Sequence, residues 1–367
     1  RGGSPANGRA GATSGAGRRL EDTAPFASNF ALALDKQGHE VIVLVVRATF
    51  TLSPARGEPS LVAPEQLPLI EADVFGPDPA WDAPVFETDF AHFRPRCDVL
   101  AHARAHAPRG EPATTVDVGI RLGPWAKKFT AHGSRIWLRG AAGHTPSEKR
   151  PFLVQDIGYD HAYGGIDPEA ENPAMAKAFP ENPAGLGYYP NSVNREGKPL
   201  AQTSEFGLDA LSPDGGFPPM AFGPLGRTWL PRRQYAGTYD DAWLDNRVPL
   251  LPMDFDDRYF QASAPDQQIA YPTGGEPVKV IMATSSWVTR RSATEPGQVT
   301  TLSQPGGRPA SSNRRAILRA VSGVADAGLS TTGQPAASAG AILWHTRFNG
   351  KLNGLMAPIT PIGTRFT

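Results

Sequence analysis

One segment of the chain, residues 40–52 (EVIVLVVRATFTL), restricts the possible folds more than any other. It is rich in β-branched residues and almost continuously apolar, which predicts a strand buried inside a sheet. Residues 30–34 predict a shorter strand, and the glycine-containing turn at residues 36–39 joins the two into a hairpin. Across the 367 residues, 39 glycines and 37 prolines interrupt the sequence and disfavour long helices. We therefore predict a mainly β fold, with antiparallel, sandwich-like sheets, long ordered loops rich in proline and glycine, and few helices.

Several further segments have the composition of strands separated by turn residues; they are residues 114–122, 126–132, 134–138, 152–158 and 277–282. Residues 97–105 also predict a strand, because Pro95 and Pro108 bracket them. On a helix, His102 and His106 would instead lie four residues apart on one face, the spacing of a two-histidine metal site. The strand is favoured, since no nearby Cys or Glu completes a ligand set.

The composition divides the chain into three parts. Residues 1–24 are mostly Gly, Ala, Ser and Arg, which predicts a disordered N-terminal segment. Residues 25–282 form the predicted β-rich domain. Residues 283–367 are a low-complexity basic tail, with a helix predicted at residues 313–324 and Asn313 as its cap. This tail is either a disordered basic accessory segment or a stretch not native to the fold, as a reading-frame slip would produce; we favour the second explanation.

Charge and cysteine content indicate the environment of the protein. The chain holds 36 basic and 36 acidic residues, which argues against nonspecific nucleic-acid binding. Cys97 is the only cysteine, so no internal disulfide is possible and a reducing compartment is expected. No apolar run is long enough to span a membrane, and no secretory signal is evident. We expect a cytoplasmic protein that binds neither nucleic acid nor membrane.

The most unusual stretch is residues 232–268, which combines six aromatic residues, seven aspartates and four arginines. Pro249, Pro252 and Pro265 prevent it from forming one long helix. Buried charges are costly unless they are paired, so we predict a packed surface in which carboxylates and guanidinium groups meet.

The aspartates of this stretch are the remaining candidates for chemistry, because phosphate-loop, nucleophile-elbow and zinc-protease motifs are absent. Alternation places Asp254 and Asp256 on one side and Phe255 on the other. Together with Asp257, and with Asp240 or Asp241, these carboxylates could form an acid/base pair or a hard-cation site. The alternative, which we favour, is that the acids pair with nearby arginines and cap turns. A carboxylate-dependent hydrolase using Asp254 and Asp256, with Asp89 as a third candidate, is the second functional hypothesis.

The order and identity of many short pieces carry a resemblance to a known family. In the central stretch they are Arg233, residues 236–240 (AGTYD), Trp243, residues 247–249 (RVP), 251–256 (LPMDFD), 258–260 (RYF), 264–268 (APDQQ) and 274–276 (GGE). Earlier pieces include residues 47–50 (RATF), 87–89 (ETD), 98–99 (DV) and 162–165 (AYGG). Together they resemble the bacterial family called domain of unknown function 2169 (DUF2169), associated with type VI secretion. The likeness is collinear from about Phe26 to Ile281, with departures at Arg47 and His161 and beyond the residue 274–276 turn.

The resemblance implies a non-enzymatic adaptor or chaperone without a cofactor. Such a protein binds a secreted effector, through a PAAR-type or related N-terminal region, and assists its loading onto the VgrG spike in the cytoplasm. Neutral charge and enrichment in Tyr, Trp and Arg suit a protein interface. The residues expected to bind the partner or to form the core of the motif are Arg233, Gly237, Tyr239, Asp240, Trp243, Arg247, Asp254, Phe255, Asp256 and Asp266. A structural β domain, in which this stretch serves only packing, is the third hypothesis.

Overall fold

The computed structural model describes residues 20–22, 26–51, 61–76, 82–167, 177–271, 278–281, 317–323, 340–349 and 364–366. Side chains are described within residues 26–49, 63–76, 82–167 and 177–271. The predicted disordered segment 1–24 contributes only β1 (Leu20–Asp22) to the described part, and its other residues lie outside it. Among the described helices, none has both the length and the apolar character required to cross a membrane.

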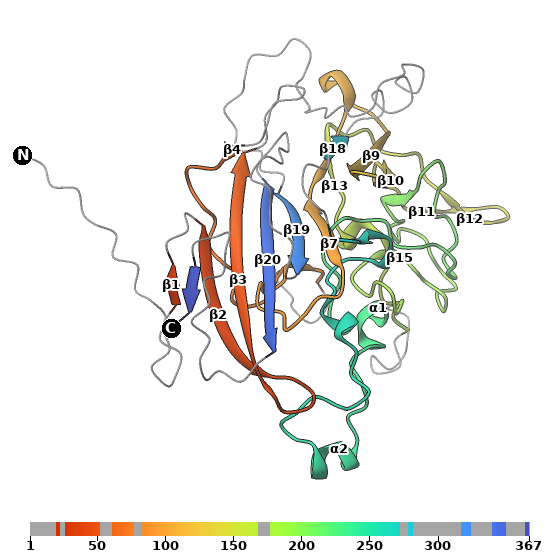
Figure 1. Ribbon diagram of the computed structural model, residues 1–367. Coiled ribbons are helices and arrows are strands. Elements are labelled where there is room, and N and C mark those ends of the chain that lie inside the picture. The colour runs from red at the N-terminus through yellow and green to blue at the C-terminus, as the bar shows by residue number, and fades with distance from the viewer. Residues whose placement is uncertain are drawn as a thin grey trace, which may run out of the picture.

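The largest sheet has seven strands in the order β17-β7-β19-β20-β3-β2, with β4 also paired to β3 (Figure 1). Its strands are β2 (Ala27–Leu34), β3 (Glu40–Thr51), β4 (Leu61–Val62), β7 (Cys97–His102), β17 (Gln268–Ile269), β19 (Ile317–Gly323) and β20 (Gly340–Asn349). All neighbouring pairs are antiparallel except β19 and β20, which run parallel. Strand β3 is the predicted central strand, and the side chains from Val41 to Thr49 are buried without interruption.

A second sheet of four strands has the order β16-β10-β9-β18. It contains β9 (Thr115–Leu122), β10 (Trp125–His132), β16 (Thr203–Glu205) and β18 (Val278–Ile281). Strands β9 and β10 form a hairpin whose two-residue turn contains Gly123, with a φ of 54° that favours glycine. The two sheets share the main core, in which Val99 of β7 joins Val118 and Ile120 of β9 and Phe129 of β10. Apolar packing therefore connects the edge of the large sheet to the small one.

The remaining described strands form short two-stranded ladders. They are β5 (Val74–Phe75) with β6 (Pro84–Phe86), β8 (Arg104–His106) with β13 (Val154–Asp156), β11 (Trp137–Gly140) with β12 (Gly143–Pro146), β14 (Tyr163–Gly164) with β15 (Leu186–Gly187), and β1 with β21 (Thr364–Phe366). Between them run the expected loops, and Phe179, Tyr188 and Phe217 anchor these loops by packing around the buried Tyr163.

The two α-helices of the described residues are short: α1 (Leu230–Arg233) and α2 (Asp241–Asn246). Four 3-10 helices accompany them at η1 (Pro108–Gly110), η2 (Tyr159–His161), η4 (Asp257–Phe260) and η5 (Pro265–Gln267). The mainly β, largely antiparallel architecture with few helices is therefore confirmed.

Two sequence predictions need correction. The predicted strand at residues 97–105 is two strands, because the chain leaves the large sheet after His102 and pairs as β8 with β13. The predicted helix at residues 313–324 is wrong over Ile317–Gly323, which is strand β19. Pairing with β7 on one side and β20 on the other determines this conformation, and outweighs the helix preference of Ala, Leu and Arg.

Strands β19, β20 and β21 all belong to the segment predicted as a basic tail, residues 283–367. Strand β20 pairs with β3 over ten residue positions, from Gly340 to Asn349. The boundary expected at residue 282 thus does not coincide with a boundary of the sheets. The other residues of this segment lie outside the described part, and its origin as a native or frame-shifted stretch stays a prediction.

The shared core makes a direct prediction for stability. Phe129 is fully buried, and its ring lies 4.7 Å from that of Phe222, measured between centroids. Phe129→Ala should lower the free energy of unfolding by about 3–5 kcal/mol, because a large cavity is left in a packed core. Leu208→Ala, at an exposed position, should change it by about 0.5 kcal/mol or less. Urea unfolding of the two variants checks this; equal losses would contradict the assignment of the core.

Candidate functional site

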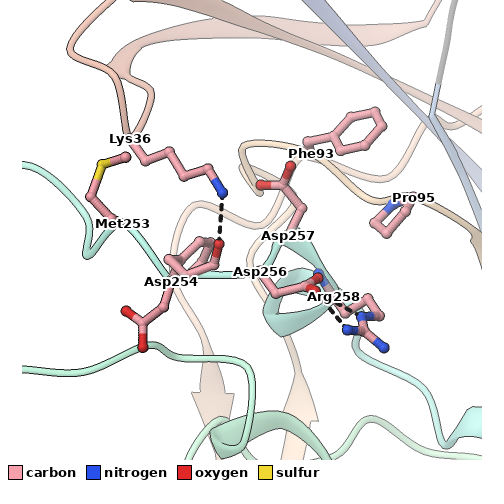
Figure 2. A pocket seen from close by; sticks show the side chains of 9 residues that line it. Lys36, Phe93, Pro95, Met253, Asp254, Asp256, Asp257 and Arg258 are labelled. Atoms are coloured by element: carbon pink, nitrogen blue, oxygen red, sulfur yellow. Dashed lines mark hydrogen bonds and ion pairs between the residues drawn. The ribbon is translucent and has the colours of Figure 1, made fainter.

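Three of the residues singled out in the sequence, Asp254, Phe255 and Asp256, line an open depression with a volume of 530 Å³. Lys36, from the turn between β2 and β3, lies on one side, and Phe93 and Pro95 lie on another. Residues 253–258 complete the lining. Figure 2 shows that the carboxylates of Asp254, Asp256 and Asp257 point in different directions rather than converging.

Asp254 is committed to Thr238. Its carboxylate accepts hydrogen bonds from the backbone N–H of Thr238 at 3.0 Å and from the Thr238 hydroxyl at 2.7 Å. These two donors, the backbone N–H first, hold the pKa of Asp254 below its ordinary value. Asp254 thus closes the loop between residues 238 and 254.

Asp256 is paired with Arg258. Its Oδ2 accepts from Arg258 Nη2 at 2.7 Å and Nε at 3.0 Å, while Oδ1 accepts from the Arg258 backbone N–H at 2.9 Å. The guanidinium hydrogen bond is the largest cause that lowers the pKa of Asp256. The expectation that the acids pair with arginine and cap a turn describes this residue well, since Asp256 also caps η4.

This arrangement limits the chemistry open to the two carboxylates. A general acid needs a raised pKa, whereas the pKa of each of these carboxyls is lowered. The third candidate, Asp89, lies apart from the lining of the depression; it is fully buried and bonds to Arg47 Nη1 at 3.2 Å and the Ile70 N–H at 2.8 Å. Within the residues that the structure describes, no group of three or more His, Cys, Asp or Glu side chains is arranged to hold a metal ion.

The two histidines considered as metal ligands lie on different strands. His102 ends β7, and its ring stacks on Phe86 with 4.4 Å between centroids. Burial lowers the pKa of His102 to about 4, so its imidazole is neutral near pH 7. His106 belongs to β8, where it has Val154 as its register partner. The helical two-histidine arrangement is therefore absent from this described segment, and Cys97 is a buried thiol as expected.

Helix α2 is built by local hydrogen bonds. Asp240 is its N-cap, accepting from the backbone N–H of Trp243 at 2.8 Å. The indole N–H of Trp243 donates to Leu250 O at 2.9 Å, which fixes the chain that leaves the helix. Tyr239 packs edge-on against Trp243, with 4.7 Å between ring centroids. Tyr239, Asp240 and Trp243, all three singled out in the sequence, therefore position α2 together.

The segment around α2 is attached to the hairpin of β2 and β3. Arg247 Nη2 donates to the carbonyl oxygens of Lys36 and of Leu251, the latter at 2.9 Å. Lys36 Nζ in turn donates to Phe255 O at 3.1 Å. Figure 1 shows α2 projecting beyond the turn of this hairpin, apart from both sheets.

The arginine that matters most for packing is Arg232, which the sequence analysis did not select. Arg233 is exposed, whereas the neighbouring Arg232 is buried and pairs with Glu87 at 2.6 Å. Glu87 also pairs with Arg94 at 3.0 Å and with Arg227 at 3.0 Å. Three guanidinium groups, two of them from the region of α1 and one from the chain before β7, thus meet one buried carboxylate. Single-sequence patterns carry no signal that distinguishes Arg232 from Arg233.

A second buried acid, Asp98, binds the chain that follows η4. Its carboxylate accepts hydrogen bonds from the Gln261 side chain, the Ala262 N–H, and both the N–H and hydroxyl of Ser263, at 2.6–3.1 Å. Arg94 connects the two acids, since its Nε lies 3.7 Å from Asp98 Oδ2. We call Glu87, Asp98, Arg94, Arg227 and Arg232 the buried charge network.

Asp266 anchors the end of the stretch. Its carboxylate pairs with Lys127 Nζ at 3.0 Å, and its carbonyl accepts from the Trp125 indole at 2.6 Å. Burial lowers the pKa of Lys127, and Asp266 opposes that shift. Gln267 is buried beside them and donates to Val99 O at 2.7 Å. Asp266 was predicted as a partner-binding or motif residue. In the structure it helps to connect the two sheets and does not line the depression.

Four large side chains in and around α2 are exposed. Tyr239, Leu244, Val248 and Met253 are 52%, 59%, 49% and 60% exposed, whereas Phe255, which follows them in the sequence, is buried. We call these four exposed residues the α2 ridge. Large apolar side chains gathered on one projecting segment are typical of surfaces that contact another molecule.

Comparison with known proteins places the chain in a family. A family model described as an uncharacterized protein conserved in bacteria, DUF2169, matches residues 37–296, well over half of the chain. It starts in the turn before β3 and ends beyond the predicted domain boundary at residue 282. Neither the curated proteins nor the solved structures give a match.

The buried charge network predicts unequal effects for two adjacent arginines. Arg232→Met should lower the free energy of unfolding by about 3–5 kcal/mol, because Glu87 loses one of its buried partners. Arg233→Met, at the exposed neighbour, should change it by about 0.5 kcal/mol or less. Denaturant unfolding of both variants measures the difference, and similar values for the two would refute the role assigned to Arg232.

Gly237 allows a second matched comparison. Its φ is 79°, and a Cβ there would lie 2.9 Å from Pro252 Cβ and 3.0 Å from Phe255 N. Gly197 has a φ of 78° but open space around it. Gly197→Ala should cost about 1 kcal/mol for the left-handed backbone alone. Gly237→Ala should cost about 2 kcal/mol or more, because the close approach is added; thermal melting of both variants tests whether the extra loss exists.

Proposed function

Because this chain belongs to the DUF2169 family, we propose that it is a non-enzymatic adaptor for a type VI secretion effector. It binds the effector in the cytoplasm, through a PAAR-type or related N-terminal region, and assists its loading onto the VgrG spike. The observation that carries the proposal is the α2 ridge, in which Tyr239, Leu244, Val248 and Met253 are exposed on a projecting segment. A binding protein requires such a surface, whereas a purely structural domain would have no use for it.

The way this segment is held also favours binding. The N-cap Asp240, the Trp243 indole bond to Leu250 O, and the Arg247 bonds to Lys36 O and Leu251 O position the ridge from three sides. A surface that is already ordered loses less conformational entropy when a partner binds. Rigid presentation of exposed apolar side chains is therefore consistent with an adaptor that holds its cargo.

The hydrolase hypothesis has less support from the geometry. Thr238 and Arg258 occupy the carboxylates of Asp254 and Asp256, and both pKa values are lowered. Asp89 is buried in contact with Arg47. The proposal therefore assigns these acids to the architecture of the adaptor, and Asp254 and Asp256 to the wall of the depression beside the ridge.

The proposal predicts the capture of an effector by the full-length chain. Tagged wild-type protein, co-expressed with each secreted protein encoded beside its gene, should retain one of them through size-exclusion chromatography. Leu244→Asp should abolish this retention, because a charge on the ridge opposes burial of the apolar contact. Val193→Asp is the matched control, since Val193 is 90% exposed but lies outside the ridge.

Thermal melting of both variants separates loss of binding from loss of folding, and both should melt within about 3 °C of wild type. If the wild-type chain retains no secreted protein at all, the adaptor proposal is wrong.

A further inference from the structure

We propose that the α2 ridge recognises a basic amphipathic segment of the partner protein, with apolar side chains flanked by Lys or Arg. This inference rests on the proposed adaptor function and specifies the chemistry of the cargo. Three observations support it: exposed aspartates flank the ridge, nearby cations already have partners within the chain, and the adjoining depression is lined by further carboxylates.

Acidic side chains flank the apolar centre of the ridge. Asp241 and Asp245 lie three and one residues from Leu244 in the same helix, so Asp241 shares a face with both Leu244 and Asp245. Residues 239–246 hold three aspartates and no Lys or Arg. Both Asp241 and Asp245 are exposed, and in the described part of the chain no ion pair involves either carboxylate. Their negative charge is thus open to a partner.

Three cations close to the ridge in the chain or in the depression beside it have partners within the protein. Arg247 donates to the carbonyl oxygens of Lys36 and Leu251. Lys36 donates to Phe255 O, and Arg258 is paired with Asp256. Arg258 is exposed with its charge balanced by Asp256, and residues 239–246 carry no Lys or Arg, so the ridge itself presents apolar surface and carboxylates.

The depression extends this surface. Met253 belongs to both the ridge and the lining of the depression, and Asp254, Asp256 and Asp257 follow it directly. Figure 2 shows the ring of Phe93 beside the Asp257 carboxylate on the far wall. Lys36 and Arg258 also line the depression, so its three carboxylates exceed its two cations by one charge. A lysine or arginine side chain of a partner would meet this excess negative charge and an aromatic ring, both of which attract a cation.

The charge also argues against other occupants. A nucleic acid or an anionic membrane would be repelled by Asp241 and Asp245. A second copy of the chain, paired ridge to ridge about a twofold axis, would bring like charges together. A partner segment that joins apolar anchors to basic residues satisfies both features of the ridge.

The test uses charge reversal in the full-length chain. The double variant Asp241→Lys/Asp245→Lys should weaken binding of the captured effector about tenfold or more, because two favourable contacts become repulsive. The matched control is Glu111→Lys/Glu196→Lys, which changes the net charge equally at exposed acids away from the ridge; it should bind within about twofold of wild type. Isothermal titration with the purified effector measures both, after thermal melting confirms that both variants fold.

A variant that removes the two charges without reversing them gives an independent measurement, the dependence of binding on salt. Raising the salt concentration from 50 to 500 mM should weaken wild-type binding, and Asp241→Asn/Asp245→Asn should reduce that salt dependence. Peptides of 15 residues that tile the effector should show strongest binding for a basic amphipathic segment. Unchanged affinity of the Lys double variant, or preference for an acidic peptide, would overturn the inference while the adaptor function stands.

Two outcomes would overturn it in other ways. If light scattering shows a dimer that Leu244→Asp dissociates, the ridge is a self-association surface. If the wild-type chain captures no effector, the proposed function and this inference fall together, a result distinct from capture that is insensitive to charge on the ridge.

Discussion

The structure depends on one buried carboxylate, that of Glu87, which three arginines contact at 2.6–3.0 Å. Charges removed from water are stable only when each has a partner, so the buried Glu87, Arg94 and Arg232 depend on one another, while the partly exposed Arg227 also pairs with Asp73 at 2.7 Å. Arg94 precedes β7, Arg227 and Arg232 flank the start of α1, and Glu87 follows β6. Their meeting therefore fixes how distant parts of the chain are placed relative to one another.

The residues around this network fall into two groups: buried polar residues that hold the fold together, and exposed residues of the α2 ridge. Buried acids and amides, such as Asp98 and Gln267, bind backbone groups of the sheets and of the loops beside them. Exposed residues of the α2 ridge bond to nothing through their apolar side chains and depend on Asp240, Trp243 and Arg247 for their position. Substitutions in the first group should change folding, whereas under the proposed adaptor function substitutions in the second should change binding.

Much of the fold could be predicted from local sequence patterns, but little of the buried charge network could be predicted in this way. The run at residues 40–52 and the turns at Gly38 and Gly123 are local signals, and they gave β2, β3, β9 and β10 nearly to their ends. Strand β19 was missed because its pairing partners are distant in sequence, and its own residues favour a helix. Glu87 and Asp98 belong to short segments that resemble the family, but the sequence analysis assigned them no role. The ion pair of Glu87 with Arg232 joins residues 145 positions apart, and a single sequence contains no pattern that reveals such a contact. Asp240 and Asp256 were predicted to cap turns because capping is local.

The attachment of the α2 segment to the β2–β3 hairpin has a mechanical consequence. A force on α2, such as the proposed cargo would exert, is shared between the backbone on either side of the segment and the side-chain bonds of Arg247 and Lys36 to the hairpin. Strand β3 has hydrogen bonds to neighbours on both sides, and these bonds run across the direction of pull. Such a ladder is loaded in shear, where many bonds resist at once, rather than opened one bond at a time. The side-chain bonds of Arg247 and Lys36, being few, would yield before the sheet does, so the projecting segment would separate from the hairpin while the backbone still joins it to α1 and η4.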